Sequence, residues 1–123
     1  MSKTGRVVLI ALLLSLAPTS VLSAHAILLE SVPAAEAAVL APPRLVLRFN
    51  SRIEARLSSV VLVGGPRQTR VGLSSPQALD RDTLVFSLPD LSPGQYRAEW
   101  QALSVDGHLT TGVVRFTVIE GTP

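Results

Sequence analysis

Short segments of alternating or continuous apolar residues run through most of the chain. The clearest alternation places Leu45, Leu47 and Phe49 on one side, with residues that include Arg48 on the other. This period of two is typical of strands that bury one face in an antiparallel sheet. Comparable patterns occur at residues 45–50, 59–63, 83–88, 95–103 and 113–118. We expect a strand in each of these segments.

Glycine and proline separate these segments and set the expected fold class. With further strands near residues 26–30 and 67–72, the count is about seven, and turn signals recur roughly every ten residues. Residues 34–40 are the only helix-like stretch, but prolines on both sides leave too short a helix, so we predict a loop or a single turn. The pattern therefore predicts an all-β domain, a β-sandwich of immunoglobulin-like type. The five aromatic residues fall on expected strands and are predicted to pack in its core: Phe49, Phe86, Tyr96, Trp100 and Phe116.

Composition narrows the possible functions. The chain has 123 residues, which is enough for one small domain. It contains no cysteine, so disulfides, zinc–thiolate sites, iron–sulfur clusters and a thiol nucleophile are excluded. It also lacks the Gly-x-Ser-x-Gly and His-Glu-x-x-His motifs of common hydrolases. We therefore expect a binding protein rather than an enzyme.

The first 24 residues have the layout of a secretory signal peptide. Two basic residues, Lys3 and Arg6, precede an apolar run at residues 7–17, and small residues follow it. The run is shorter than the roughly 20 residues that span a bilayer, and it follows no Arg-Arg pair. We expect export by the general secretory route, removal of residues 1–24, and a mature domain of residues 25–123 that does not insert into a membrane.

Removal of this segment changes the charge balance. The whole chain carries eleven basic and nine acidic residues, and Lys3 and Arg6 are the only charged residues among the first 24. The mature domain would then hold nine residues of each sign. A neutral domain without a cationic run is a poor nucleic-acid ligand, so we expect no nucleic-acid partner.

Two histidines and one aspartate are the candidate metal ligands. Asp106 and His108 lie between the two clearest strands, and in an extended segment their side chains would project to the same side. A carboxylate and an imidazole could then bind one ion. The Asp106-Gly107 pair is also a strong hairpin signal, which would make His108 an exposed loop histidine. The other histidine, His25, would become the first residue after cleavage behind Ala24.

The cleavage position decides whether this second histidine has a free amine. Cleavage after Ala24 exposes His25, whereas cleavage after Ala26 fits the small-x-small rule better and would remove the histidine. An N-terminal histidine can chelate one metal through its α-amine and its imidazole Nδ1. With Asp106 and His108, the donor set would be three nitrogens and one oxygen, which suits divalent copper.

Other metals fit this donor set less well. Zinc without thiolate ligands is possible but prefers a tetrahedron, and calcium and magnesium prefer oxygen ligands. Cuprous copper prefers sulfur, but the only methionine of the chain is Met1, which lies in the signal segment. We therefore expect one Cu(II) ion per mature chain.

Several blocks of the sequence occur in a characteristic order. They are residues 25–34, 42–49, 94–100, 104–108 and 112–118, which read HAILLESVPA, PPRLVLRF, GQYRAEW, SVDGH and GVVRFTV. Together they resemble the bacterial periplasmic copper-resistance protein C (CopC) family over residues 25–119. The resemblance implies a cupredoxin-like, immunoglobulin-like Greek-key fold and favours cleavage after Ala24. It also implies a periplasmic carrier that holds Cu(II) through three residues: His25, Asp106 and His108.

The resemblance further implies a role in copper homeostasis and resistance. We expect a monomer that buffers Cu(II) or delivers it, to an inner-membrane copper importer of the kind associated with this family. Some members carry a methionine-rich cuprous site, which this chain lacks. Two alternatives remain open. One is a copper-brace redox enzyme of the polysaccharide monooxygenase type, and the other is a metal-free immunoglobulin-like interaction module, which cleavage after Ala26 would favour.

Overall fold

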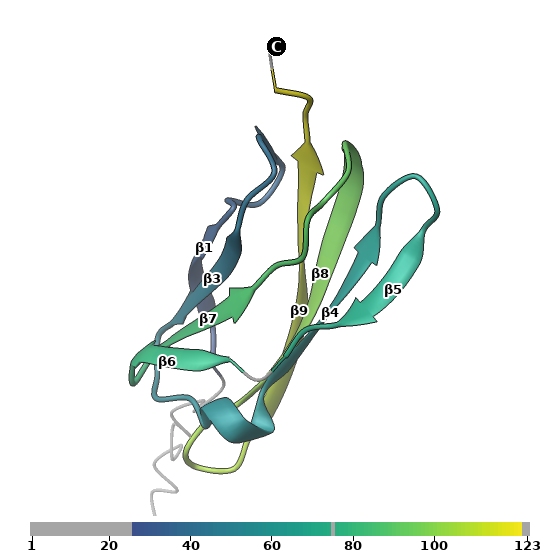
Figure 1. The fold of residues 1–123 in the computed structure, drawn as a ribbon. Coiled ribbons are helices and arrows are strands. Elements are labelled where there is room, and N and C mark those ends of the chain that lie inside the picture. The colour runs from purple at the N-terminus through teal and green to yellow at the C-terminus, as the bar shows by residue number, and fades with distance from the viewer. Residues whose placement is uncertain (1–25, 75, 122–123) are drawn as a thin grey trace, which may run out of the picture.

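Nine strands and one short 3-10 helix make up the part of the chain that the computed structural model describes, residues 26–74 and 76–121 (Figure 1). In chain order they are β1 (Leu28–Val32), β2 (Ala37–Val39), β3 (Arg44–Phe49), η1 (Ala55–Leu57), β4 (Ser59–Gly64), β5 (Thr69–Gly72), β6 (Gln77–Asp80), β7 (Thr83–Ser87), β8 (Gly94–Leu103) and β9 (Leu109–Val118). The prediction of an all-β sandwich is confirmed.

The strands form two sheets. One has four strands in the order β1-β3-β7-β6, and the other has five in the order β2-β9-β8-β4-β5. Every strand pairing is antiparallel except that of β2 with β9, which is parallel. The two sheets lie as separate layers in Figure 1. Because the chain crosses repeatedly between them, segments distant in sequence meet at each end of the sandwich.

The inner faces of both sheets supply the core, as the alternation predicted. On β8 the buried residues are Tyr96, Ala98, Trp100 and Ala102. All five aromatic residues of the chain are at most 7% exposed, which confirms their predicted place in the core. Phe49 meets Trp100 edge-on with 5.2 Å between ring centroids, and Tyr96 stacks on Phe116 at 5.7 Å. Burial of this apolar surface is the main stabilising contribution.

Two details of the sequence prediction are wrong. Residues 37–39, expected in a loop or single turn, form β2, and residues 77–80 form β6, which the sequence pattern did not reveal. β2 exists because β9 and its flanks supply hydrogen bonds: the Glu36 N–H donates to the Arg115 carbonyl at 2.6 Å. β6 is fully exposed, so it has no alternation to detect. Both are edge strands that depend on a partner more than on their own sequence.

The hairpin of β8 and β9 has ten residue pairs, of which the pair Leu103 and Leu109 lies nearest the turn. Within it, Trp100 lies opposite Gly112, and a Cβ at Gly112 would lie 2.3 Å from Cζ2 of the indole. Only glycine leaves room for the tryptophan there. The hairpin carries the turn at residues 104–108 to one end of the sandwich, the lower end in Figure 1.

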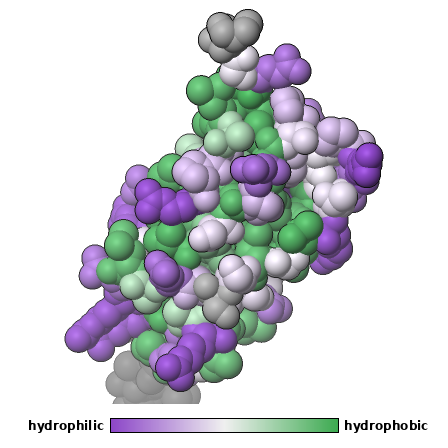
Figure 2. Space-filling view, in the orientation of Figure 1, coloured by the Kyte–Doolittle hydropathy of each residue, from purple (hydrophilic) through white to green (hydrophobic). Residues whose placement is uncertain are grey.

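Hydrophobic and hydrophilic residues are interspersed on the face of the molecule drawn in Figure 2. Within the part of the chain that the structure describes, no helix has the length and apolar character needed to cross a membrane. The predicted signal segment, residues 1–24, lies outside the described residues, so its assignment stays a prediction.

Candidate metal centre

The turn between β8 and β9 brings Asp106 and His108 together. Nδ1 of His108 lies 3.2 Å from Oδ1 of Asp106, and the backbone N–H of His108 donates to the same oxygen at 3.3 Å. Gly107 between them has a φ of +91°, a left-handed conformation that favours glycine. The segment is therefore the turn that the Asp-Gly pair indicated and not an extended stretch. The two side chains meet because the turn folds one back toward the other.

Ser104 lies at the base of this turn and is only 2% exposed. Its Oγ donates to Oδ1 of Asp106, and it also contacts the carbonyl oxygen of His108 at 3.1 Å. The backbone N–H of Ser104 donates to the same carbonyl at 3.0 Å, and its own carbonyl accepts from the Gly107 N–H at 2.9 Å. This one buried residue therefore contacts Asp106, Gly107 and His108, which form the candidate site.

These contacts favour the ionised form of Asp106. The Ser104 hydroxyl, which donates to the carboxylate, is the largest influence holding the pKa of Asp106 below its ordinary value of 3.8. Desolvation acts in the opposite direction, and the backbone N–H and imidazole of His108 lower the pKa further. The side chains of Asp106 and His108 are 37% and 56% exposed, so an ion in solution can reach both.

The start of β1 lies at the same end of the sandwich as this turn. The Ile27 N–H donates to Oδ1 of Asn50 at 2.7 Å, and the Asn50 N–H donates to the Ile27 carbonyl at 3.0 Å. Two residues further along, the carbonyl of Arg52 accepts from the Val105 N–H at 3.1 Å. The segment that follows β3 is thus hydrogen-bonded to the start of β1 on one side and to the β8–β9 turn on the other.

The structure brings two of the three predicted ligands together. Asp106 and His108 are in contact, whereas His25 lies outside the described residues. Ala26, the next residue in the chain, is 1% exposed and belongs to the core. Among the described residues, no group of three or more His, Cys, Asp or Glu side chains could hold a metal ion. A site at this turn therefore needs a ligand from elsewhere, and the sequence places His25 directly before Ala26.

Three buried polar atoms in the described structure have no hydrogen-bond partner: Oγ of Ser51, Nε1 of Trp100 and Oγ1 of Thr110. Ser51 follows Asn50, which binds the start of β1, and Thr110 comes two residues after His108. Buried polar atoms are nearly always paired, with protein or with ordered water. We therefore expect ordered water to pair with these atoms.

Ser104 is the residue of this site that the sequence analysis missed. A serine at the start of a turn commonly hydrogen-bonds to groups two to four residues later, here Asp106 and His108. The Asp-Gly signal located the turn but not the burial of the serine. That burial depends on the pairing of Ser104 with Ile53, on a segment far away in sequence.

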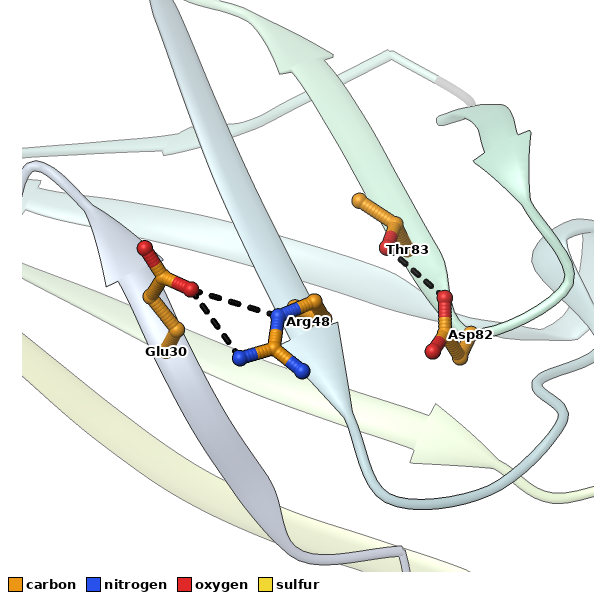
Figure 3. A network of polar contacts seen from close by, with 4 residues as sticks. All are labelled: Glu30, Arg48, Asp82 and Thr83. Carbon is orange, nitrogen blue, oxygen red and sulfur yellow. Dashed lines mark hydrogen bonds and ion pairs between the residues drawn. The ribbon is translucent and has the colours of Figure 1, made fainter.

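Glu30 has a different role from the candidate ligands. Its Oε2 accepts from Nη2 of Arg48 at 3.0 Å and from Nε at 3.2 Å, across β1 and β3 (Figure 3). In the same view Thr83 donates to the Asp82 carboxylate at 2.9 Å. These side chains make contacts within the four-stranded sheet, and we assign them no ligand role.

The burial of the aromatic residues bears on the redox-enzyme alternative. A surface that stacks sugars needs several exposed aromatic rings. All five aromatic residues of this chain are at most 7% exposed, and the two ring pairs lie inside the sandwich. The chain therefore offers no aromatic platform to a polysaccharide.

Known proteins share both the sequence pattern and the fold. The CopC domain pattern matches residues 28–119. The chain belongs to the CopC family. Among curated proteins similar to this chain, Protein YobA of Escherichia coli K12 is 36% identical over 98 residues, which cover 77% of this chain and 79% of YobA. Copper resistance protein C of Escherichia coli is 30% identical over 109 residues, which cover 77% of this chain and 82% of the relative.

Solved structures of the CopC family agree with this assignment. CopC from Methylosinus trichosporium OB3b has a TM-score of 0.68 at 32% identity, over 76% of this chain and 93% of that protein. PcoC, a methionine-rich copper resistance protein from Escherichia coli, has a TM-score of 0.65 at 31% identity, over 77% of this chain and 99% of PcoC. The predicted family and β-sandwich are confirmed, and membership relates this chain to copper resistance.

Proposed function

We propose that this CopC-family chain is a periplasmic carrier of Cu(II), with His25, Asp106 and His108 as its ligands. The observation that carries the proposal is the 3.2 Å contact between Nδ1 of His108 and Oδ1 of Asp106, on an exposed turn of the family fold. The hydrogen bonds of the segment after β3 support it, because they bring the start of β1 to the same end of the sandwich.

The contacts within the turn suggest which atoms bind copper. Nδ1 of His108 and Oδ1 of Asp106 lie 3.2 Å apart, so the two side chains are close enough to bind one ion together. The contacts of Asp106 with Ser104 and His108 all reach Oδ1, so we assign Oδ2 to the metal. The α-amine and Nδ1 of an N-terminal His25 then complete a set of three nitrogens and one oxygen. Cu(II) favours such a set in a tetragonal geometry.

Composition favours Cu(II) over Cu(I). The chain has no cysteine, and its single methionine is Met1. Cuprous copper prefers thiolate and thioether ligands, which the mature domain lacks. PcoC is a methionine-rich relative, and this chain differs from it in that respect. We therefore carry over no methionine-rich cuprous site.

Export and delivery complete the proposal. Cleavage after Ala24 exposes the amine of His25, and the general secretory route places the mature domain in the periplasm. There the domain buffers Cu(II) or, as a monomer, delivers it to an inner-membrane copper importer. The exposure of Asp106 and His108 supports a carrier, because an accepting protein can reach an ion bound at this turn.

The first test is a Cu(II) titration of the mature protein, followed by electron paramagnetic resonance. The full-length chain is secreted and purified, and the intact mass of the same sample identifies the first residue. We expect a mass that begins at His25 and one equivalent of tetragonal Cu(II) with coupling to three nitrogens. A control variant with one alanine inserted before His25 keeps both imidazoles but loses the amine chelate, and it should bind more weakly.

Three results would contradict the proposal. A mass that begins at Ile27, or a spectrum like that of Cu(II) on an unstructured peptide, would leave a metal-free interaction module. Equal affinity of the alanine-insertion variant would exclude the N-terminal chelate. Hydrogen peroxide production with ascorbate, together with cleavage of a polysaccharide, would establish the redox-enzyme alternative.

A further inference from the structure

The Asp106 carboxylate receives hydrogen bonds of two kinds. The donors on His108 belong to the exposed turn itself. The donor on Ser104 comes from a residue that is 2% exposed and whose backbone forms a bridge with buried Ile53. Of these two donor residues, Ser104 is thus the one fixed to the body of the sandwich. It connects the orientation of an exposed carboxylate to the packed core.

A fixed donor matters because an exposed carboxylate rotates freely. Binding a metal freezes that rotation, and the lost freedom weakens affinity unless the group is already oriented. An ionised carboxylate only accepts hydrogen bonds, so the Ser104 hydroxyl must be the donor. By holding Oδ1 of Asp106, the hydroxyl restricts the directions in which Oδ2 can point.

We propose that Ser104 is a positioning residue of the copper site, whose hydroxyl orients the Asp106 carboxylate before the metal binds. The backbone N–H of Ser104 donates to the carbonyl of His108 at 3.0 Å, so the hydroxyl is needed only for Asp106. This inference rests on the proposed Cu(II) function and adds a residue that contacts no metal. Groups that orient metal ligands typically change affinity by about 10-fold to 100-fold when removed.

The test compares two buried serines at this end of the sandwich in the secreted mature protein. Ser104→Ala removes the hydroxyl that contacts Asp106. The matched control, Ser58→Ala, removes a hydroxyl that is also buried and that bonds to the Glu54 carbonyl at 2.8 Å and to the Leu103 N–H at 3.1 Å. We expect both variants to lower Tm, but only Ser104→Ala to weaken Cu(II) binding, by about 10-fold. Only Ser104→Ala should also alter the copper hyperfine splitting.

A double-mutant cycle separates positioning from general destabilisation. If Ser104 acts through Asp106, then Ser104→Ala should have no further effect on Cu(II) affinity in an Asp106→Ala background. Additive losses would mean that the serine acts independently of the carboxylate, which would overturn the inference. Ser104→Thr keeps the hydroxyl, and a folded Thr variant should restore the wild-type copper spectrum.

The outcomes distinguish this inference from the function on which it rests. If the wild-type protein begins at His25 and gives the three-nitrogen signal, the carrier proposal stands. Should Ser104→Ala then keep the wild-type affinity and spectrum, or should Ser58→Ala lose as much affinity, only the role of Ser104 is overturned. If the wild-type protein shows no site of this kind, the carrier proposal fails, and the inference fails with it.

Discussion

The two ends of the β8–β9 hairpin are built from different interactions. At the end far from the turn, Tyr96 stacks on Phe116 at 5.7 Å, and its hydroxyl donates to the Ser92 carbonyl at 2.7 Å. Gly64 fits beside this pair with a φ of +144°, where a Cβ would lie 2.2 Å from the Gln95 carbonyl oxygen. Apolar stacking and close backbone approach therefore fix this end, which we call the packed end.

At the turn end, polar contacts replace packing. Asp106 and His108 are 37% and 56% exposed, and hydrogen bonds centred on Ser104 hold them. Exposed polar contacts add little to the free energy of unfolding, but they orient donor atoms toward solvent. The difference shows how a domain of this size can combine stability with ligand chemistry. Stability comes from the core and the packed end, so we expect that the candidate ligand residues can change at the turn without loss of the fold.

The largest expected effect is on stability at the packed end. Phe116 is 2% exposed, so Phe116→Ala should lower the free energy of unfolding by about 3–5 kcal/mol through lost burial and a cavity. Denaturant titration of the copper-free mature protein measures the change. Thr117→Ala, at the next position on β9, is the control and should cost less than about 1 kcal/mol. Equal losses for the two variants would contradict the assignment of stability to the packed end.

The next effect is on copper affinity at the turn end. His108→Ala removes a proposed ligand and should weaken Cu(II) binding about 100-fold, equivalent to about 2.8 kcal/mol of binding free energy. Because the side chain is 56% exposed, the free energy of unfolding should change by less than about 0.5 kcal/mol. Val105→Ala, an exposed apolar change in the same turn, should leave both quantities unaltered. If His108→Ala lowered the free energy of unfolding as much as Phe116→Ala, the two ends would not differ in their contribution to stability.

Acid should separate copper binding from folding. The imidazole and amine ligands must lose protons to bind, so Cu(II) affinity should fall steeply below about pH 6. Asp106 contributes differently, because its folded-state pKa lies below 3.8. Its stabilising contribution is complete above the unfolded-state pKa and disappears only as the pH falls through the lower folded-state value. The copper-free protein should therefore lose no stability through this group between pH 7 and pH 5, and affinity unchanged down to pH 4 would exclude the ligand set.

The smallest effect is expected for a surface ion pair between β1 and β3, in the sheet that does not contain the β8–β9 hairpin. Glu30 and Arg48 are joined at 3.0 Å, but their side chains are 60% and 44% exposed. Glu30→Gln should therefore cost less than about 1 kcal/mol, and raised salt should reduce the difference. Thermal unfolding at two ionic strengths measures it. A change in Cu(II) affinity would show that Glu30 acts on the metal site, contrary to its assignment here.

Three of the strands that alternation located share one physical feature. β3, β8 and the last part of β9 each bury one face, so local alternation records their tertiary environment. β2 and β6 are edge strands with no fully buried residue, so apolar and polar residues do not alternate along them in a way that predicts a strand. Their existence depends on hydrogen bonds from β9 and β7.

The candidate site likewise contains residues that the sequence identified and one that it did not. Residue type and spacing identified Asp106 and His108, because a carboxylate and an imidazole near a turn are recognisable ligands. The sequence left open whether their segment is extended or an Asp-Gly turn, and the structure has the turn, with a positive φ at Gly107. Ser104 could not be recognised, because its burial comes from the bridge to Ile53 and not from its neighbours in sequence.

The sequence by itself determined the all-β class, the family, the core aromatic residues and the chemical types of the candidate ligands. These are properties of periodicity and residue type, which the chain carries locally. Only the tertiary structure decided that Asp106 and His108 touch, that a buried serine holds their turn, and that the start of β1 reaches the same end of the sandwich. Such relations join segments through backbone hydrogen bonds, and these depend on how the two sheets pack.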